Sequence, residues 1–161
     1  MNASIYRLQD RLASRVTKFS GQKFALSEHS KKGVMILEDN DPTREMLATI
    51  LTSNGYHVFE AYCETQAIKV WKQNFPQIDL LLADICIPYR TTGIEIAKAF
   101  LAEKSWLKVI YTSGFDSEIA APEKFRLVEG ENFVQKPFSP DYLLQTIKKV
   151  FPERPKLLAD W

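Results

Sequence analysis

Four short apolar segments of the 161-residue chain each end on polar side chains that could act together. The carboxyl ends of parallel strands line the crevice in which open α/β sheets bind ligands. Four strands of this kind would therefore bring three carboxylates, a hydroxyl and a lysine to one place. In chain order, the set is Glu38 and Asp39, Asp84, Thr112 and Ser113, and Lys136.

The chemistry that fits this set is phosphoryl transfer to a carboxylate. Three crowded carboxylates repel one another unless one is protonated or a cation joins them. An all-oxygen site with few protein ligands suits Mg²⁺, which also binds phosphate oxygens. A lysine and a hydroxyl opposite the metal would complete a cage for a phosphoryl group. We therefore expect Asp84, at the end of a fully apolar segment, to accept a phosphoryl group and form an aspartyl phosphate.

Alternating strand-like and helix-like segments could position these residues. Five βα units in series predict an α/β domain with a parallel sheet and helices on both faces. Pro122 should keep any helix between the last two strands short or irregular. Strands are expected at 34–37, 57–62, 79–83, 108–112 and 132–135. Helical segments are expected at 41–55, where Asn54 and Gly55 are the stop signal, and at 64–74, 93–103 and 139–151.

Two of the helices carry clear start signals. Asp41 is expected to be the N-cap of the first helix, with Pro42 at its first helical position. Ser139 is expected to cap the last helix in the same way. The apolar face of the first helix is predicted to consist of Met46, Leu47, Ile50 and Leu51.

The N-terminal residues 1–32 differ from the rest of the chain. They carry seven Lys/Arg and two Asp/Glu, a balance of +5, whereas residues 33–161 carry fourteen and eighteen, a balance of −4. We predict one amphipathic helix followed by a linker. It could pack on the domain or on a copy of itself, or it could bind a partner or a membrane surface. The apolar stripe of this helix is Ile5, Leu8, Leu12, Val16 and Phe19.

Composition argues against two classes of protein, general nucleic-acid binders and membrane-spanning proteins, and indicates the cellular compartment. A net charge of +1 argues against a general nucleic-acid binder. No apolar run approaches the length of a membrane span. The two cysteines, Cys63 and Cys86, are too few for a disulfide scaffold, so we expect a reducing, cytoplasmic location.

The sequence resembles the receiver domain of two-component response regulators. The resemblance rests on four motifs, which occur in the order and at the separations typical of receivers: "ILEDN", "DLLLADICIP", "VIYTSG" and "FVQKPF". The resemblance covers about residues 33–151 and leaves 152–161 as a C-terminal tail. It implies a flavodoxin-like, doubly wound five-stranded sheet of order 2-1-3-4-5. It also implies that the chain receives its phosphoryl group from a histidine kinase or a histidine phosphotransfer protein.

The resemblance also implies roles for the metal site. Glu38 and Asp39 resemble the acidic pair that holds Mg²⁺, Glu38 mainly through water, although an aspartate is commoner at that position. Asp84 and the backbone carbonyl of Cys86 would complete the protein ligands. Lys136 resembles the lysine that pairs with the phosphate.

Three further positions carry expectations from the family. The bond from Lys136 to Pro137 would be cis. The switch hydroxyl would belong to Ser113, with Thr112 as the alternative. Phe133 resembles the switch aromatic, although it could be a plain core residue.

The function expected from these residues is that of a single-domain response regulator, which is not an enzyme beyond its own phosphorylation and dephosphorylation. It would signal through altered contacts with an unknown protein target, or serve as a phosphate relay or sink. A homodimer is a further possible assembly. The loop 88–93 is one residue longer than in most receivers and resembles those attached to hybrid histidine kinases. The alternatives are a pseudo-receiver that is never phosphorylated and an Asp-nucleophile phosphatase, which would lack its second aspartate because Cys86 stands there.

Overall fold

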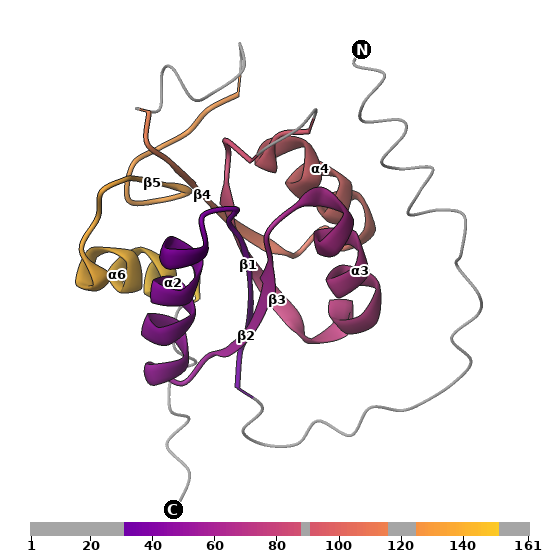
Figure 1. Cartoon of the computed structure of the whole chain (residues 1–161), viewed down its shortest axis with the longest axis horizontal. Helices are drawn as coiled ribbons and strands as arrows, with labels where there is room; N and C mark the ends of the chain where they lie inside the picture. Colours follow the sequence, from indigo (N-terminus) through magenta and orange to yellow (C-terminus); the bar gives the residue numbers. More distant parts are fainter. Residues whose placement is uncertain (1–30, 88–90, 116–124, 152–161) are drawn as a thin grey trace, which may run out of the picture.

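The computed structural model of the chain describes residues 31–87, 91–115 and 125–151 (Figure 1). The N-terminal amphipathic helix and the C-terminal tail predicted above therefore lie outside the described residues. So does part of the loop 88–93.

A parallel sheet of five strands, in the order β2-β1-β3-β4-β5, forms the centre of the molecule, as predicted. The central strands β1 and β3 are almost entirely buried because helices cover both faces of the sheet. The strands are β1 (Gly33–Leu37), β2 (His57–Ala61), β3 (Ile78–Asp84), β4 (Lys108–Ser113) and β5 (Phe133–Gln135).

Helices cover the two faces in pairs, with α2 and α6 on one side and α3 and α4 on the other (Figure 1). Trp71 of α3 stacks on Phe100 of α4, with ring centroids 4.2 Å apart, and this pair forms the centre of one core layer. The helices are α2 (Asp41–Ser53), α3 (Glu64–Asn74), α4 (Gly93–Glu103) and α6 (Pro140–Val150), and a short 3-10 helix, η1 (Phe75–Gln77), follows α3.

The start of α2 differs from the prediction. The N-cap is Asn40, not Asp41: its side chain accepts a hydrogen bond from the backbone N–H of Thr43, at 3.0 Å. Asn40 has the extended backbone that an N-cap requires, whereas Asp41 is already helical. Ser139 caps α6 as predicted and accepts from the N–H of Tyr142.

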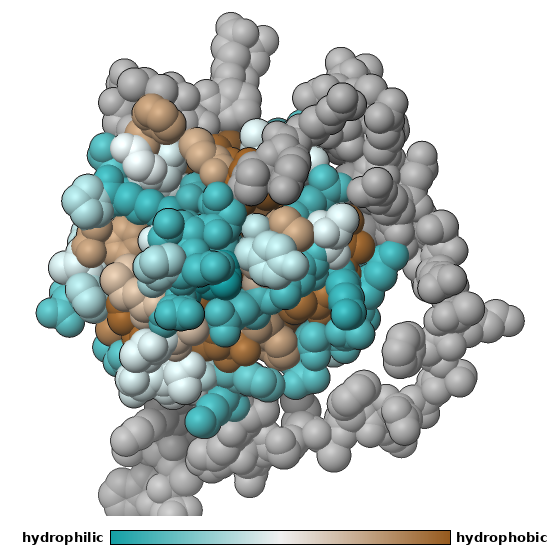
Figure 2. Space-filling model, in the orientation of Figure 1, coloured by the Kyte–Doolittle hydropathy of each residue, from teal (hydrophilic) through white to brown (hydrophobic). Residues whose placement is uncertain are grey.

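The apolar face of α2 is narrower than predicted. Leu47 and Leu51 are buried, but Met46 is 43% exposed. The buried stripe is centred on Leu47 and Leu51, and Met46 lies beside it, towards solvent. The face of the molecule seen in Figure 2 is largely hydrophilic, with hydrophobic side chains showing between the polar ones.

Between β4 and β5, the described residues 125–132 contain no helix. An irregular segment was expected here because of Pro122, which itself lies outside the described residues. None of the described helices is both long and apolar enough to cross a bilayer.

The buried lysine Lys104 joins α4 to the segment before β3. Its Nζ donates to the backbone carbonyls of Phe75, at 3.1 Å, and Ile78, at 2.6 Å. Burial lowers the pKa of Lys104 below its ordinary value of 10.5, and the charge of Asp79 opposes this only in part. The amine therefore has a structural function, as the partner of two carbonyls.

We expect Lys104→Met to lower the free energy of unfolding by about 2 kcal/mol, since the carbonyls of Phe75 and Ile78 both lose the Lys104 amine as a donor. The loss should grow as the pH rises toward 10.5. In that range the unfolded chain binds more protons at Lys104 than the folded chain, so the wild type gains stability that the variant cannot.

Urea unfolding near pH 7 and about pH 9.5 measures both effects. The exposed Lys69→Met is the matched control for loss of a lysine charge. A wild-type advantage over Lys104→Met that shrinks at the higher pH would contradict the interpretation.

Candidate functional site

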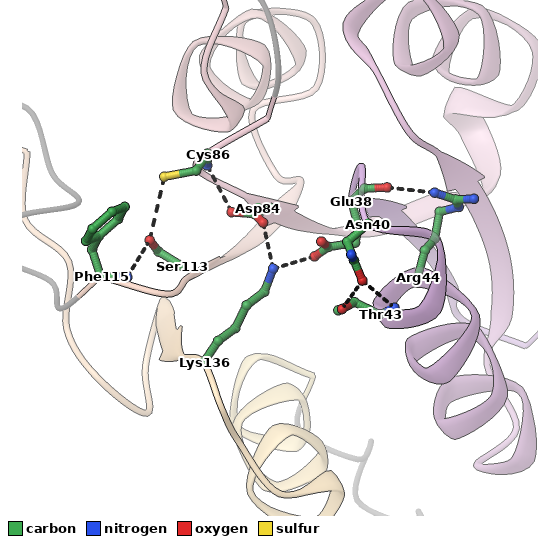
Figure 3. A network of polar contacts seen from close by, with 9 residues as sticks. All are labelled: Glu38, Asn40, Thr43, Arg44, Asp84, Cys86, Ser113, Phe115 and Lys136. Carbon is green, nitrogen blue, oxygen red and sulfur yellow. Dashed lines mark hydrogen bonds and ion pairs between the residues drawn. The ribbon is translucent and has the colours of Figure 1, made fainter.

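The predicted polar set converges at the carboxyl ends of the strands (Figure 3). Glu38 follows β1, Asp84 ends β3, Ser113 ends β4 and Lys136 follows β5. Because the strands are parallel and β1, β3, β4 and β5 are consecutive in the sheet, their ends meet at one edge. The side chains come from positions as far as 98 residues apart in the sequence.

The three carboxylates form one cluster. Each of Glu38, Asp39 and Asp84 offers an oxygen, and these oxygens all lie within 4.8 Å of one another. Glu38 and Asp84 are buried, whereas Asp39 is exposed. An oxygen-only donor set that is partly open to solvent fits Mg²⁺, which keeps several of its waters.

Lys136 bridges two of the acids. Its Nζ lies 2.6 Å from Glu38 Oε2 and 2.6 Å from Asp84 Oδ2. Burial by itself disfavours the ammonium, but the hydrogen bonds and charges of Asp84 and Glu38 outweigh it and raise the pKa of Lys136. The lysine is therefore a fixed cation at neutral pH.

Glu38 is the most deeply buried acid of the cluster. Burial raises the pKa of its carboxyl above the ordinary value of 4.5, more than Lys136 lowers it. The nearby charge of Asp84 raises this pKa further. A carboxylate in this position needs a cation beside it, and Lys136 meets part of that need.

Asp84 is held through both of its oxygens. Oδ2 accepts from Lys136, and Oδ1 accepts from the backbone N–H of Cys86, at 2.9 Å. The side chain therefore points from the end of β3 towards Lys136 and Glu38, not back into the sheet (Figure 3).

Ser113, the predicted switch hydroxyl, joins the network through Cys86, two residues after Asp84. Its Oγ lies 3.8 Å from Cys86 Sγ and accepts from the N–H of Phe115, at 3.1 Å (Figure 3). Neighbouring side chains of a strand point to opposite faces. Thr112 therefore points to the opposite face from Ser113, and it is the register partner of Asp84 on β3. The choice between Ser113 and Thr112 as the switch hydroxyl stays a prediction.

The remaining predicted positions are placed as follows. The Lys136–Pro137 peptide bond is cis, as expected. Phe133 is 1% exposed and packs in the core layer under α3 and α4, so it lies outside the polar network. Cys86 is exposed. The roles of Phe133 as a switch aromatic and of the Cys86 carbonyl as a metal ligand stay predictions.

Two supporting residues were not predicted. Arg44 of α2 donates from Nη1 to the backbone carbonyl of Glu38, at 3.0 Å, and also pairs with Asp41 and Glu60. Its position in the first turn of the helix that follows the acidic pair was the available signal, since a helix places such a side chain back over its own N-terminus.

Gly93, the first residue of α4, is the second supporting residue that was not predicted. A Cβ at this position would lie 2.0 Å from the backbone oxygen of Asp84. The glycine lets α4 begin directly against the end of β3, and thereby fixes the backbone of Asp84. Nothing in the sequence around Gly93 predicted its close approach to the backbone of Asp84.

Comparison with known proteins gives one consistent result. A family model described as a response regulator receiver domain matches residues 34–148. The phosphate regulon transcriptional regulatory protein PhoB of Pseudomonas aeruginosa is 32% identical over 124 residues, which are 74% of this chain and 51% of PhoB. The polar-differentiation response regulator DivK of Brucella ovis is 27% identical over 119 residues, 73% of this chain and 94% of DivK.

Solved structures share the fold. The receiver domain of PhyR from Erythrobacter litoralis superimposes with a TM-score of 0.66 at 22% identity, and covers 81% of this chain and 97% of that domain. CheY in a CheX–CheY–BeF3–Mg²⁺ complex from Borrelia burgdorferi gives a TM-score of 0.61 at 25% identity, over 75% of this chain and 90% of that one. The chain spans about half the length of PhoB but nearly all of DivK.

Proposed function

Because this chain belongs to the response regulator receiver domain family of two-component signalling, we propose that it accepts a phosphoryl group on Asp84 in a Mg²⁺-dependent reaction. One observation carries the proposal: the Asp84 carboxylate lies in a cluster with two further acids and is hydrogen-bonded to the ammonium of Lys136. This set contains a nucleophile, the ligands for a cation and a counter-charge for phosphate oxygens.

The reaction is a displacement at phosphorus. A carboxylate oxygen of Asp84 forms the new P–O bond, while the P–N bond of a phosphohistidine breaks and its electron pair remains on the imidazole nitrogen. Lys136 leaves the Glu38–Asp84 bridge in part and stabilises the phosphoryl oxygens. The Ser113 hydroxyl accepts from the N–H of Phe115, and its proton would turn from the weak acceptor Cys86 Sγ to a phosphoryl oxygen.

Glu38, Asp39, Asp84 and the carbonyl of Cys86 would hold the Mg²⁺ ion. When bound, the ion neutralises charge that develops on the transferring phosphoryl group and lowers the repulsion among the carboxylates. The fit rests on the three carboxylate oxygens within 4.8 Å of one another, with Lys136 as a fixed cation between two of them.

The partners follow from the chemistry. The donor is a histidine kinase or a histidine phosphotransfer protein, and the output is an altered contact with a protein target or onward transfer of the phosphoryl group. We do not expect the chain to hydrolyse a separate phosphate ester, because Cys86 occupies the position at which an Asp-nucleophile phosphatase carries its second aspartate.

The test is incubation of the full chain with acetyl phosphate and Mg²⁺, followed by intact-mass measurement. We expect a gain of one phosphoryl group, with acetate released, and no gain when EDTA removes the metal. No gain in the presence of Mg²⁺ would contradict the proposal and favour a pseudo-receiver. Sustained hydrolysis of a phosphate ester would contradict it in favour of a phosphatase.

A further inference from the structure

The end of the sheet opposite the acidic site carries an exposed aromatic surface, which we name the basal patch (Phe75, Lys104 and Trp106). Trp106 is 68% exposed and Phe75 is 36% exposed. Lys104 joins the two: its Nζ donates to the carbonyl of Phe75 and lies 6.0 Å from the centroid of the Trp106 ring. Lys104 therefore links the backbone that carries Phe75 to the ring of Trp106, and both aromatic side chains are exposed at this end of the sheet.

The basal patch lies where the N-terminal segment enters the domain. Gly33, the first residue of β1, packs so closely on η1 that a Cβ there would lie 1.8 Å from the backbone oxygen of Gln77. Its N–H donates to Asp79 Oδ2, at 3.0 Å. Gln77 belongs to the same short helix as Phe75. The described chain therefore begins beside η1, which carries Phe75 of the basal patch, at the lower end of β1 in Figure 1.

The N-terminal segment that precedes β1 carries an apolar stripe, which could pack against the exposed aromatic side chains of the basal patch. The stripe is spaced for one face of a helix, and its flanks are basic, in a segment with a balance of +5 against −4 for the rest of the chain. The stripe consists of Ile5, Leu8, Leu12, Val16 and Phe19.

The tether between the stripe and the domain is long enough. The eleven residues 20–30 can span up to about 36 Å when extended. A tether of this length gives an effective concentration in the millimolar range, so that even a weak contact is occupied within one chain.

We propose that the apolar stripe of residues 5–19 packs on the basal patch of its own chain. The contact would cover Phe75 and Trp106, which the described residues leave exposed, and would remove the apolar stripe from water. Asp84 lies at the other end of β3, so the docked segment leaves the phosphoryl acceptor accessible. The proposal does not depend on phosphorylation of Asp84.

Site-specific photo-cross-linking in the full chain tests the proposal. Trp106→p-benzoylphenylalanine places the cross-linker in the basal patch, and Phe115→p-benzoylphenylalanine places it on an exposed aromatic position beside the acidic site. Equal amounts of ¹⁵N-labelled and unlabelled chain are irradiated together, and cross-linked peptides are identified by mass spectrometry.

We expect cross-links from position 106 to residues 5–19 within one chain, and at least about fivefold fewer from position 115. Cross-links that join labelled to unlabelled chains would overturn the proposal and show that a second copy covers the patch. The absence of cross-links from position 106 to the segment would overturn it as well.

A pair of matched variants separates docking by the stripe from simple proximity. Leu8→Asp with Leu12→Asp places two charges on the apolar stripe, whereas Ser14→Asp with Thr17→Asp places two on the opposite face of the same helix. We expect the first pair to lose the cross-link from position 106 and the second to keep it. Equal cross-linking in both pairs would show that the stripe does not make the contact and would overturn the proposal.

Discussion

Asp84→Asn is expected to abolish the gain of a phosphoryl group from acetyl phosphate and Mg²⁺. The amide is a poor nucleophile, and the substitution removes one of the three carboxylates that we propose to hold Mg²⁺, so the new P–O bond cannot form and the proposed metal site is weakened. The fold should persist, because an asparagine oxygen can still accept from the N–H of Cys86 or from Lys136. Fewer crowded carboxylates should even favour the folded state in the absence of metal.

Intact mass after a fixed incubation is the readout, with circular dichroism as the check on folding. The matched control is Asp141→Asn, which removes an exposed carboxylate in the first turn of α6 and should be phosphorylated like the wild type. A phosphoryl gain that persists in Asp84→Asn would show that another side chain is the acceptor, and the assignment of Asp84 would then be wrong.

Lys136→Met is expected to have the second large effect, on two quantities. The rate of phosphorylation should fall about 10²-fold, the size of effect seen when one preorganised donor to a developing charge is removed. A small amount of product should still form, because Asp84 and the acidic pair remain. The product should fail to change target binding, since no ammonium pairs with the phosphate.

The same variant should be less stable when Mg²⁺ is absent. Glu38 and Asp84 are buried, and Lys136 is their shared partner at 2.6 Å. Removing one member of a buried charge cluster costs roughly 3 kcal/mol, and added Mg²⁺ should restore part of the loss by taking the place of the cation.

Urea unfolding with EDTA and with Mg²⁺ measures this effect. The control is Lys148→Met, which removes an exposed lysine of α6 and should be neutral to both stability and phosphorylation. A Lys136→Met chain as stable as the wild type in EDTA would contradict the idea that the lysine offsets the repulsion among the acids. An unchanged rate of phosphorylation would contradict its part in the transfer.

The sequence alone was enough to predict the type and order of the strands and of helices α2, α3, α4 and α6, and the ends of some of them. The bounds of α3 and α4 agree with the prediction at both ends, because local signals mark them: apolar spacing within each helix, and breaks in that spacing at its ends. The order of alternating strands and helices was enough to predict a parallel sheet, and the polar residues at four strand ends were enough to predict one site.

Tertiary structure decided what local patterns do not contain. The Lys136 bridge between Glu38 and Asp84 depends on where the ends of three strands lie relative to one another. The position of Ser113, not Thr112, beside Cys86 depends on which face of β4 each side chain takes. The physical reason is that each of these contacts joins residues that are distant in the chain, so its free energy depends on the register between strands and not on the residues near it in sequence.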